Sequence, residues 1–278
     1  TSCGDSVRAV IRRSLPLLCL CFFLSGFGSL ILEVVWTRQL RLIFGSTTLA
    51  ASTILVAYML GLGLGGLVGG RVAGRLRRGL AVYGGVEIAI GLVALAVPFL
   101  LDALPPLARA LVIDAGPWGL VLGRFLVALL VLLVPTILMG ATLPIVVAAV
   151  TRDDPAIGAR TGLLYGINTL GAVAGVFATA FVLFPALGLW RSNVVGALLD
   201  VAVGVVALLL LGRVGVASGD ASEAEVSATT HGGSSSATAP LAPDDVPPVG
   251  VLLVSYALVG FTALVYEVCW TRALALVL

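Results

Sequence analysis

The sequence predicts an all-helical membrane protein, with a six-helix half-bundle followed by the first helix of a second parallel repeat. Three observations support this prediction. Hydrophobic residues make up 60% of the chain and charged residues only 11%, whereas soluble domains have about 45–50% and about 25%. Long apolar runs recur along the chain, and one peptide of the first run occurs again in the last. So much apolar surface requires lipid as its solvent.

Seven apolar runs are long enough to cross a bilayer, whose core of about 30 Å needs about 20 helical residues. They cover residues 15–36, 47–69, 80–101, 120–150, 161–183, 194–212 and 249–270. The fourth run is longer than a bilayer requires and contains Pro135 and Pro144. We therefore expect it to be kinked, tilted or broken.

These runs divide the chain into four parts. Residues 1–13 are expected to form a cytoplasmic tail, residues 14–213 the half-bundle, residues 214–248 a flexible cytoplasmic linker, and residues 249–278 the first helix of a truncated second repeat. The linker is rich in Ser, Ala, Gly, Thr, Asp and Pro. Such a composition cannot bury enough apolar surface to fold.

The repeated peptide is the most informative feature of the chain. Residues 26–42 (GFGSLILEVVWTRQLRL) and 260–276 (GFTALVYEVCWTRALAL) agree at ten of seventeen positions with a constant offset of 234. Such a repeat predicts two related halves. Each copy ends with a carboxylate, an indole and a guanidinium, namely Glu33, Trp36 and Arg38, then Glu267, Trp270 and Arg272.

The residues of this peptide carry their own expectations. Trp36 and Trp270 fit an interfacial belt at the outer face of the membrane. Glu33 and Arg38 are five residues apart, which is poor spacing for a pair on one helix face. We therefore expect each to pair with another helix.

The arginines predict the orientation. All sixteen basic residues are Arg, and a cytoplasmic N-terminus places ten of them inside and six outside. Cytoplasmic loops of membrane proteins carry such an excess, so we expect a multi-pass membrane protein with a cytoplasmic N-terminus and with the lipid bilayer as its partner. No basic patch is interleaved with aromatic residues, which argues against nucleic acid as a partner. The cysteines lack ligand spacing, so no metal site is expected.

Glycines in two runs predict close helix packing, because small residues let backbones approach in lipid. The second run ends GLGLGGLVGGRVAGR, in which glycines recur every four residues. A dinucleotide-binding loop would require a preceding strand, and a membrane helix precedes this one. The glycines expected to pack are Gly61, Gly65, Gly69, Gly70, Gly74, Gly171 and Gly175.

Ionisable residues inside membrane runs are costly and face a bundle interior or a cavity. The acidic candidates are Glu33, Glu87, Asp200 and Glu267. Two interpretations remain open. The acids could belong to a proton or cation path, or each could pair with an arginine such as Arg124 on another helix and lock the bundle. Likewise, Tyr165 and Asn168 could line a polar site or clamp two helices.

Several segments together resemble one known family. They are SGFGSLILEVVWTRQLRLIFGST (residues 25–47), the glycine-rich second run, PTILMGATLP (135–144), YGINTLGAVAG (165–175) and FPALGL (184–189). The chain is similar in these segments to the bacterial fused major facilitator/spermidine synthase family. The resemblance makes the half-bundle major-facilitator-like.

One loop extends this resemblance. GRVAGRLRR (residues 70–78) resembles the loop between the second and third helices of major facilitator proteins. Gly74 stands where that loop normally has an acid. The resemblance implies a gating role for Arg71 and Arg75, and a positive-inside anchor is the alternative.

The resemblance also implies a function. In this family a membrane part precedes a cytoplasmic aminopropyltransferase-like domain, which would bind decarboxylated S-adenosylmethionine and a polyamine. That domain is not in this chain, so no cofactor and no catalytic residue are expected here, and the chain alone is not expected to be an enzyme. We expect a membrane domain linked to polyamine synthesis or movement, with a polyamine or another small cation as a partner. The alternatives are a facilitator-type transporter without an enzymatic domain and a membrane anchor or scaffold.

Overall fold

The computed structural model describes residues 3–45, 48–76, 78–112, 117–150, 157–211 and 248–277. These residues form two compact units, which are described separately. Within the described ranges the chain forms helices and turns and no strand, which confirms the predicted all-helical class. Most of the predicted linker lies outside the described residues.

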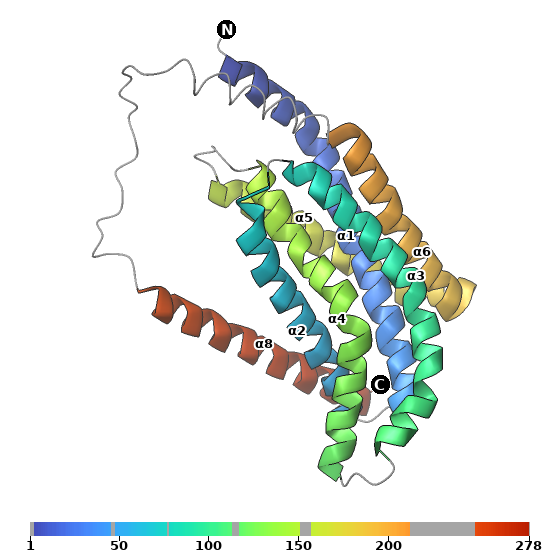
Figure 1. The fold of residues 1–278 in the computed structure, drawn as a ribbon. Coiled ribbons are helices and arrows are strands. Elements are labelled where there is room, and N and C mark those ends of the chain that lie inside the picture. Colours follow the sequence, from blue (N-terminus) through green and yellow to red (C-terminus); the bar gives the residue numbers. More distant parts are fainter. Residues whose placement is uncertain are drawn as a thin grey trace. The chain divides into compact units, whose positions relative to one another are not determined.

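The helices of the first unit follow the predicted runs closely (Figure 1). They are α1 (Cys3–Phe44), α2 (Thr48–Ala73), α3 (Gly79–Val112), α4 (Pro117–Val150), α5 (Ile157–Ala178) and α6 (Phe184–Val206), with π-helical turns η1 (Thr179–Leu183) and η2 (Ala207–Leu211). The second unit contributes α8 (Val249–Val277). Helix α1 starts within the residues predicted as a tail.

Helix α4 is one continuous helix. Pro135 and Pro144 both lie inside it, so of the kink, tilt or break that were expected as alternatives, the break does not occur. The Thr136 hydroxyl donates to the carbonyl oxygen of Leu132 at 2.6 Å, and the Thr142 hydroxyl donates to a carbonyl oxygen at 2.7 Å. Hydroxyl groups that bond to the local backbone help a membrane helix to accommodate proline.

Five stretches of the described residues are long and apolar enough to cross a membrane. The last of them runs for 53 residues, from Ile157 to Leu209. As a straight helix it would measure about 80 Å, more than twice the bilayer core of about 30 Å. It bends at Gly188, whose φ of 72° and ψ of −176° are not helical. Each limb is then long enough to cross once, in line with the fifth and sixth predicted runs.

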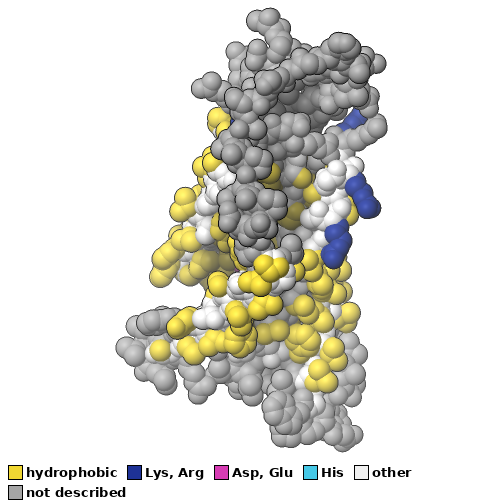
Figure 2. Space-filling view, turned by 90° about the vertical axis from the view of Figure 1, so that its left-hand side faces the viewer, with side chains coloured by type: hydrophobic (Ala, Val, Ile, Leu, Met, Phe, Trp, Pro, Cys, Tyr) yellow, Lys and Arg dark blue, Asp and Glu magenta, His cyan; other side chains and the backbone are white. Residues whose placement is uncertain are grey.

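Helix α1 lies in the middle of the first unit (Figure 1). It packs most extensively against α5 and α6, while α2 packs against α4, and α3 packs against both α4 and α6. Figure 2 shows that hydrophobic side chains cover much of the described surface on one face. No acidic side chain is visible among the described residues on that face.

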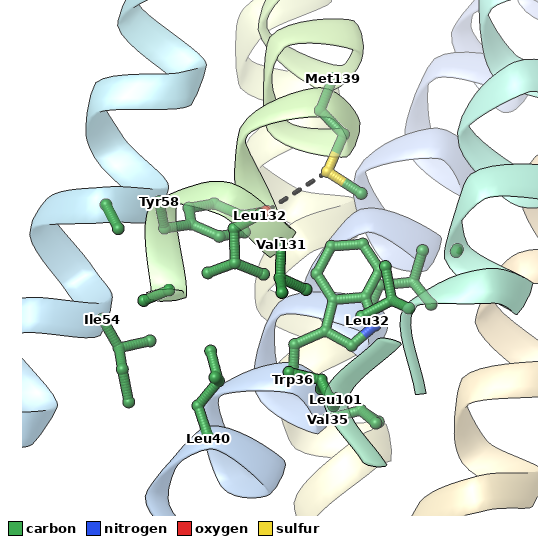
Figure 3. Packing of buried hydrophobic residues seen from close by; sticks show 14 of the residues in the cluster. Leu32, Val35, Trp36, Leu40, Ile54, Tyr58, Leu101, Val131, Leu132 and Met139 are labelled. Atoms are coloured by element: carbon green, nitrogen blue, oxygen red, sulfur yellow. Dashed lines mark hydrogen bonds between the residues drawn. The ribbon is translucent and has the colours of Figure 1, made fainter. Parts of the chain in front are cut away.

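Trp36 lies in the hydrophobic core of the first unit rather than in an interfacial belt (Figure 3). Its side chain is fully buried, so the prediction of an exposed belt position is wrong for this residue. Its indole Nε1 donates to Oδ1 of Asn193 on α6 at 2.8 Å, and Asn193 Nδ2 donates to the carbonyl oxygen of Ala94 on α3 at 2.9 Å. A buried indole needs such an acceptor, and α6 supplies it. The side chain of Trp270 is not among those described.

Glycines bring α2 and α4 into backbone contact. A Cβ at Gly65 would collide with the carbonyl oxygen of Ile137, and one at Gly69 would lie 2.8 Å from Cα of Ala141. Gly61 faces α4 in the same way. The two helices are parallel, because successive glycines of α2 meet residues that lie progressively nearer the C-terminal end of α4.

Gly70 and Gly74 do not pack as predicted. Both are exposed, and a Cβ at either position would meet nothing within 4 Å. Gly70 lies on another side of α2 from the row that faces α4, and Gly74 follows the end of this helix. Only one of the two glycine rows is therefore a packing surface within this unit.

The same contact recurs between α1 and α5. A Cβ at Gly171 would collide with the carbonyl oxygen of Phe23, and one at Gly175 with that of Phe27. Gly171 and Gly175 both lie 106 residues after the glycines at 65 and 69 (171 − 65 and 175 − 69). The helices that face these glycines correspond in the same way. A Cβ at Gly26 on α1 would meet the carbonyl oxygen of Asn168 on α5, and one at Gly140 on α4 would meet that of Leu62 on α2.

This correspondence relates the first three helices to the next three. Helix α1 corresponds to α4 and α2 to α5, so the α2–α4 contact is the counterpart of the α5–α1 contact. Helices α3 and α6 correspond to each other, and their contact is reciprocal. A Cβ at Gly84 would meet the carbonyl oxygen of Gly204 at 2.8 Å, and one at Gly204 would meet that of Gly84 at 2.6 Å.

Candidate functional site

Two carboxyl groups are buried inside the first unit. Glu87 on α3 and Asp200 on α6 both have 0% exposure. They lie near the reciprocal contact of Gly84 and Gly204, where the two antiparallel helices approach closely. Glu87 lies three residues after Gly84, and Asp200 lies four residues before Gly204. Because the two helices are antiparallel, both steps lead in the same direction, so the two acids lie at the same level of the bundle. They are close enough to interact electrostatically.

The hydrogen bonds around this acid pair are incomplete. Ser25 Oγ on α1 donates to Glu87 Oε1 at 2.7 Å. Among the described residues, no group donates to Glu87 Oε2 or to either carboxylate oxygen of Asp200. The Tyr83 hydroxyl, one helical turn before Glu87, is also buried and lies beside Glu87 and Ser25. Several buried polar groups thus gather at one point.

Helix α1 makes room for Asp200 with a glycine. A Cβ at Gly28 would collide with Asp200 Oδ1. Any larger residue there would push the carboxyl group or the helix away. The acid pair is therefore enclosed by three helices. Helix α1 contributes Ser25 and Gly28, α3 contributes Tyr83 and Glu87, and α6 contributes Asp200.

Electrostatics limits what this site can hold. A charged carboxylate in an apolar interior is costly unless it is paired and fully hydrogen-bonded. Two carboxylates side by side repel each other in addition. A proton on one of the two groups, or a small cation beside them, would relieve this cost.

A third acid, Glu33 on α1, contacts a buried tyrosine. The Tyr58 hydroxyl on α2 is hydrogen-bonded with the Glu33 carboxylate on α1 and interacts electrostatically with Asp200. It also lies 3.4 Å from the sulfur of Met139, in donor geometry. Figure 3 shows Tyr58 directed toward Met139 within the core. Glu33 itself is half-buried.

Asn168 connects two helices. Its Nδ2 donates to the carbonyl oxygen of Phe22 on α1 at 3.0 Å, which is the clamp alternative of the two considered. Tyr165 is 59% exposed, and its side chain is not enclosed with Asn168. These two residues do not form a polar pocket in this unit.

The predicted arginines lie apart from the acid pair. Arg38 is exposed, with its guanidinium 5.5 Å from the centre of the Phe184 ring, so it contacts α6 through an aromatic face. Arg71 and Arg75 are exposed at the end of α2. The side chains of Arg124 and Arg272 are not described, and Glu267 belongs to the separately described second unit.

Sequence reasoning named both acids of the pair but missed their neighbours. Tyr83 could have been found, because a residue four positions before Glu87 shares its helix face. Ser25 and Tyr58 come from other helices, and no local pattern marks them. Within the described residues, no group of three or more His, Cys, Asp or Glu side chains could hold a metal ion.

Comparison with known proteins adds no assignment. No protein-family model, curated protein or solved structure matches this chain. The functional argument therefore depends on the residues of the site.

Proposed function

We propose that this chain is the membrane domain of a fused major facilitator/spermidine synthase protein of the bacterial inner membrane, with its N-terminus in the cytoplasm. We further propose that its bundle is half of a carrier that moves a polyamine or another small cation. Polyamine synthesis would then belong to a cytoplasmic domain outside this chain, where decarboxylated S-adenosylmethionine would bind. The family segments in the sequence and the geometry of the acid pair support the two parts of the proposal.

The correspondence of three helices with the next three supports a facilitator-like half-bundle. Major facilitator halves are built from two three-helix units of opposite orientation. Helix α3 is antiparallel to both α4 and α6, so α4 and α6 run in the same direction. Helix α1 is antiparallel to α6 and therefore also runs opposite to α4. The repeated glycine contacts then relate the two three-helix units by inversion.

One observation favours a carrier over an anchor or scaffold. Glu87 and Asp200 are fully buried, and three of their four carboxylate oxygens accept no hydrogen bond from a described residue. An anchor gains nothing from two such groups, since apolar residues of similar size would be more stable there. A carrier needs an acidic site inside the bundle to bind and release its coupling ion.

The carrier proposal is tested by uptake into liposomes. The full-length protein is reconstituted and given labelled putrescine or spermidine, with Glu87→Gln and Asp200→Asn as variants. Each variant removes one charge and keeps the shape of the side chain. A charged hydrogen-bonding interaction contributes about 1.5–3 kcal/mol, so we expect uptake to fall about tenfold or more.

The matched control is Asp102→Asn. Asp102 lies on the same helix as Glu87 but is exposed, so this variant removes an acid without changing the buried site. It should keep wild-type uptake. Equal uptake by wild type, Glu87→Gln and Asp200→Asn would refute the carrier role of the pair. The family assignment has its own test, because it requires an aminopropyltransferase-like domain encoded after Leu278.

A further inference from the structure

Helix α1 forms one wall of the acid site with two residues, Ser25 and Gly28. Ser25 Oγ donates to Glu87 Oε1 at 2.7 Å, and a Cβ at Gly28 would collide with Asp200 Oδ1. These two wall residues are three positions apart, so they lie on the same face of the helix, about one turn from each other. Both acids therefore lie against a single short stretch of α1. One acid is bound by a hydroxyl donor, and the other is accommodated by the absence of a side chain.

The second copy of this stretch lacks both features. The repeat has a constant offset of 234, so its counterparts of the wall residues are Val259 (25 + 234) and Thr262 (28 + 234). Valine has no hydroxyl group that could donate to a carboxylate. Threonine has a Cβ, which the site in the first half excludes, and the Thr262 hydroxyl donates to the carbonyl oxygen of Leu258 in its own helix at 2.8 Å. Helix α8 therefore cannot form the same wall.

Other contact residues of α1 are kept in the copy. A Cβ at Gly26 would collide with the carbonyl oxygen of Asn168 on α5, and glycine recurs at position 260. The Trp36 indole donates to Asn193 on α6, and tryptophan recurs at position 270. The copy thus keeps a glycine and an indole of the kind that join α1 to α5 and α6. It differs where α1 meets the two acids.

We propose that the protein builds this acid site once, in its first half. The wall residues of α1 position Glu87 and Asp200 there, and the second-half helices that correspond to α3 and α6 carry no acid at the matching positions. An acid opposite Thr262 would collide with its side chain, and one opposite Val259 would lack the donor that Glu87 has. Burying a carboxylate without such a partner is costly. The inference rests on the proposed function, because it assumes the second repeat, and it specifies a carrier whose two similar halves share one acid site.

A double-mutant cycle tests Gly28 as a positioning residue, with unfolding of the full-length protein by SDS in mixed micelles as the readout. Gly28→Ala should shift the transition to a lower SDS fraction, because the added methyl group meets the Asp200 carboxylate. In the Asp200→Ala background it should cause no such shift. The nearest remaining atom is then the carbonyl oxygen of Gly196 at 3.5 Å, an ordinary contact distance. Equal shifts in both backgrounds would indicate general helix packing and overturn the positioning role.

Ser25→Ala tests the other wall residue with a smaller change to the fold. It should lower the SDS fraction of unfolding in the wild type, where it removes the donor to Glu87, but not in the Glu87→Leu background, which has no acceptor. Ser29→Ala is the matched control, because it makes the same change one turn further along α1, and α8 has alanine at the corresponding position 263. The control should shift both backgrounds equally. If Ser25→Ala also did so, its role at the acid would be ruled out.

The second half is tested by its sequence. The gene after Leu278 should encode neither Asp nor Glu at the counterparts of Glu87 and Asp200, while the counterpart of Asn193 should be a hydrogen-bond acceptor for the indole of Trp270. An acid at either counterpart would contradict the single site and leave the proposed carrier intact. The absence of a second repeat would instead overturn the proposed half-bundle and this inference together.

Exchange of residues between the two copies tests the halves separately in the uptake assay. Ser25→Val combined with Gly28→Thr gives α1 the residues of α8, and uptake should fall about tenfold or more, as for the acid variants. Val259→Ser combined with Thr262→Gly makes the reverse exchange and should keep wild-type uptake. An equal loss in both variants would refute the single site. Absence of uptake by the wild type would refute the carrier alone, because the unfolding cycles and the sequence still decide this inference.

Discussion

Replacing Gly65 by Ala should separate α2 from α4 and destabilise the first unit. The added methyl group would collide with the carbonyl oxygen of Ile137. A backbone atom cannot rotate away as a flexible side chain can, so the helices themselves must move. Overpacking of this kind costs about 1–3 kcal/mol, while the better helix propensity of Ala returns at most about 1 kcal/mol. We expect the free energy of unfolding to fall by about 1–2 kcal/mol.

The same helix provides the control. Gly63 is exposed, and a Cβ there would meet nothing within 4 Å. Gly63→Ala should therefore keep the stability of the wild type or raise it by up to about 1 kcal/mol. Gly171→Ala tests the correspondence between α2 and α5. Its methyl group would collide with the carbonyl oxygen of Phe23, so its loss should match that of Gly65→Ala.

The assay is reversible unfolding in mixed lipid and detergent micelles. Added SDS unfolds the helices, and circular dichroism and tryptophan fluorescence follow the transition. The two contact variants should unfold at a lower SDS fraction than the wild type, and Gly63→Ala should not. If Gly65→Ala and Gly63→Ala unfolded at the same SDS fraction, the close contact of α2 with α4 would be refuted.

Three further substitutions have defined outcomes in the same assay. Trp36→Phe leaves the buried Oδ1 of Asn193 without its donor, so the free energy of unfolding should fall by about 1–3 kcal/mol. An unchanged transition would contradict the hydrogen bond. Gly188→Ala places a side chain at a φ of 72° in a region that is almost exclusive to glycine, and should cost about 1–3 kcal/mol. Glu87→Gln combined with Asp200→Asn should raise stability, because the variant no longer buries incompletely paired acids. A loss of stability would instead indicate a structural role for the acids.

The membrane helices could be predicted from the sequence because span length is a direct property of an apolar run. The bend between the fifth and sixth spans was harder to place. Helix continues from Ile157 to Leu211 apart from a single non-helical residue, Gly188, within the motif FPALGL. The sequence has many glycines, and no local pattern distinguishes the one whose φ is positive within a span from those that pack.

The glycine rows show the same limit in another form. Gly65 and Gly70 belong to similar rows in one helix, yet the first contacts α4 and the second meets nothing within 4 Å. A helix that is apolar all round does not reveal which side faces a neighbour. Trp36 was misplaced for a related reason, because its position at the end of an apolar run fits both an interfacial belt and a buried hydrogen bond.

The acid pair could be predicted from the sequence only in part. The cost of an ionisable group in lipid was enough to single out Glu87 and Asp200 separately. Their meeting depends on the contact of α3 with α6, whose residues are 113 positions apart (200 − 87). Close approaches at Gly84, Gly91 and Gly204 bring the two helices together.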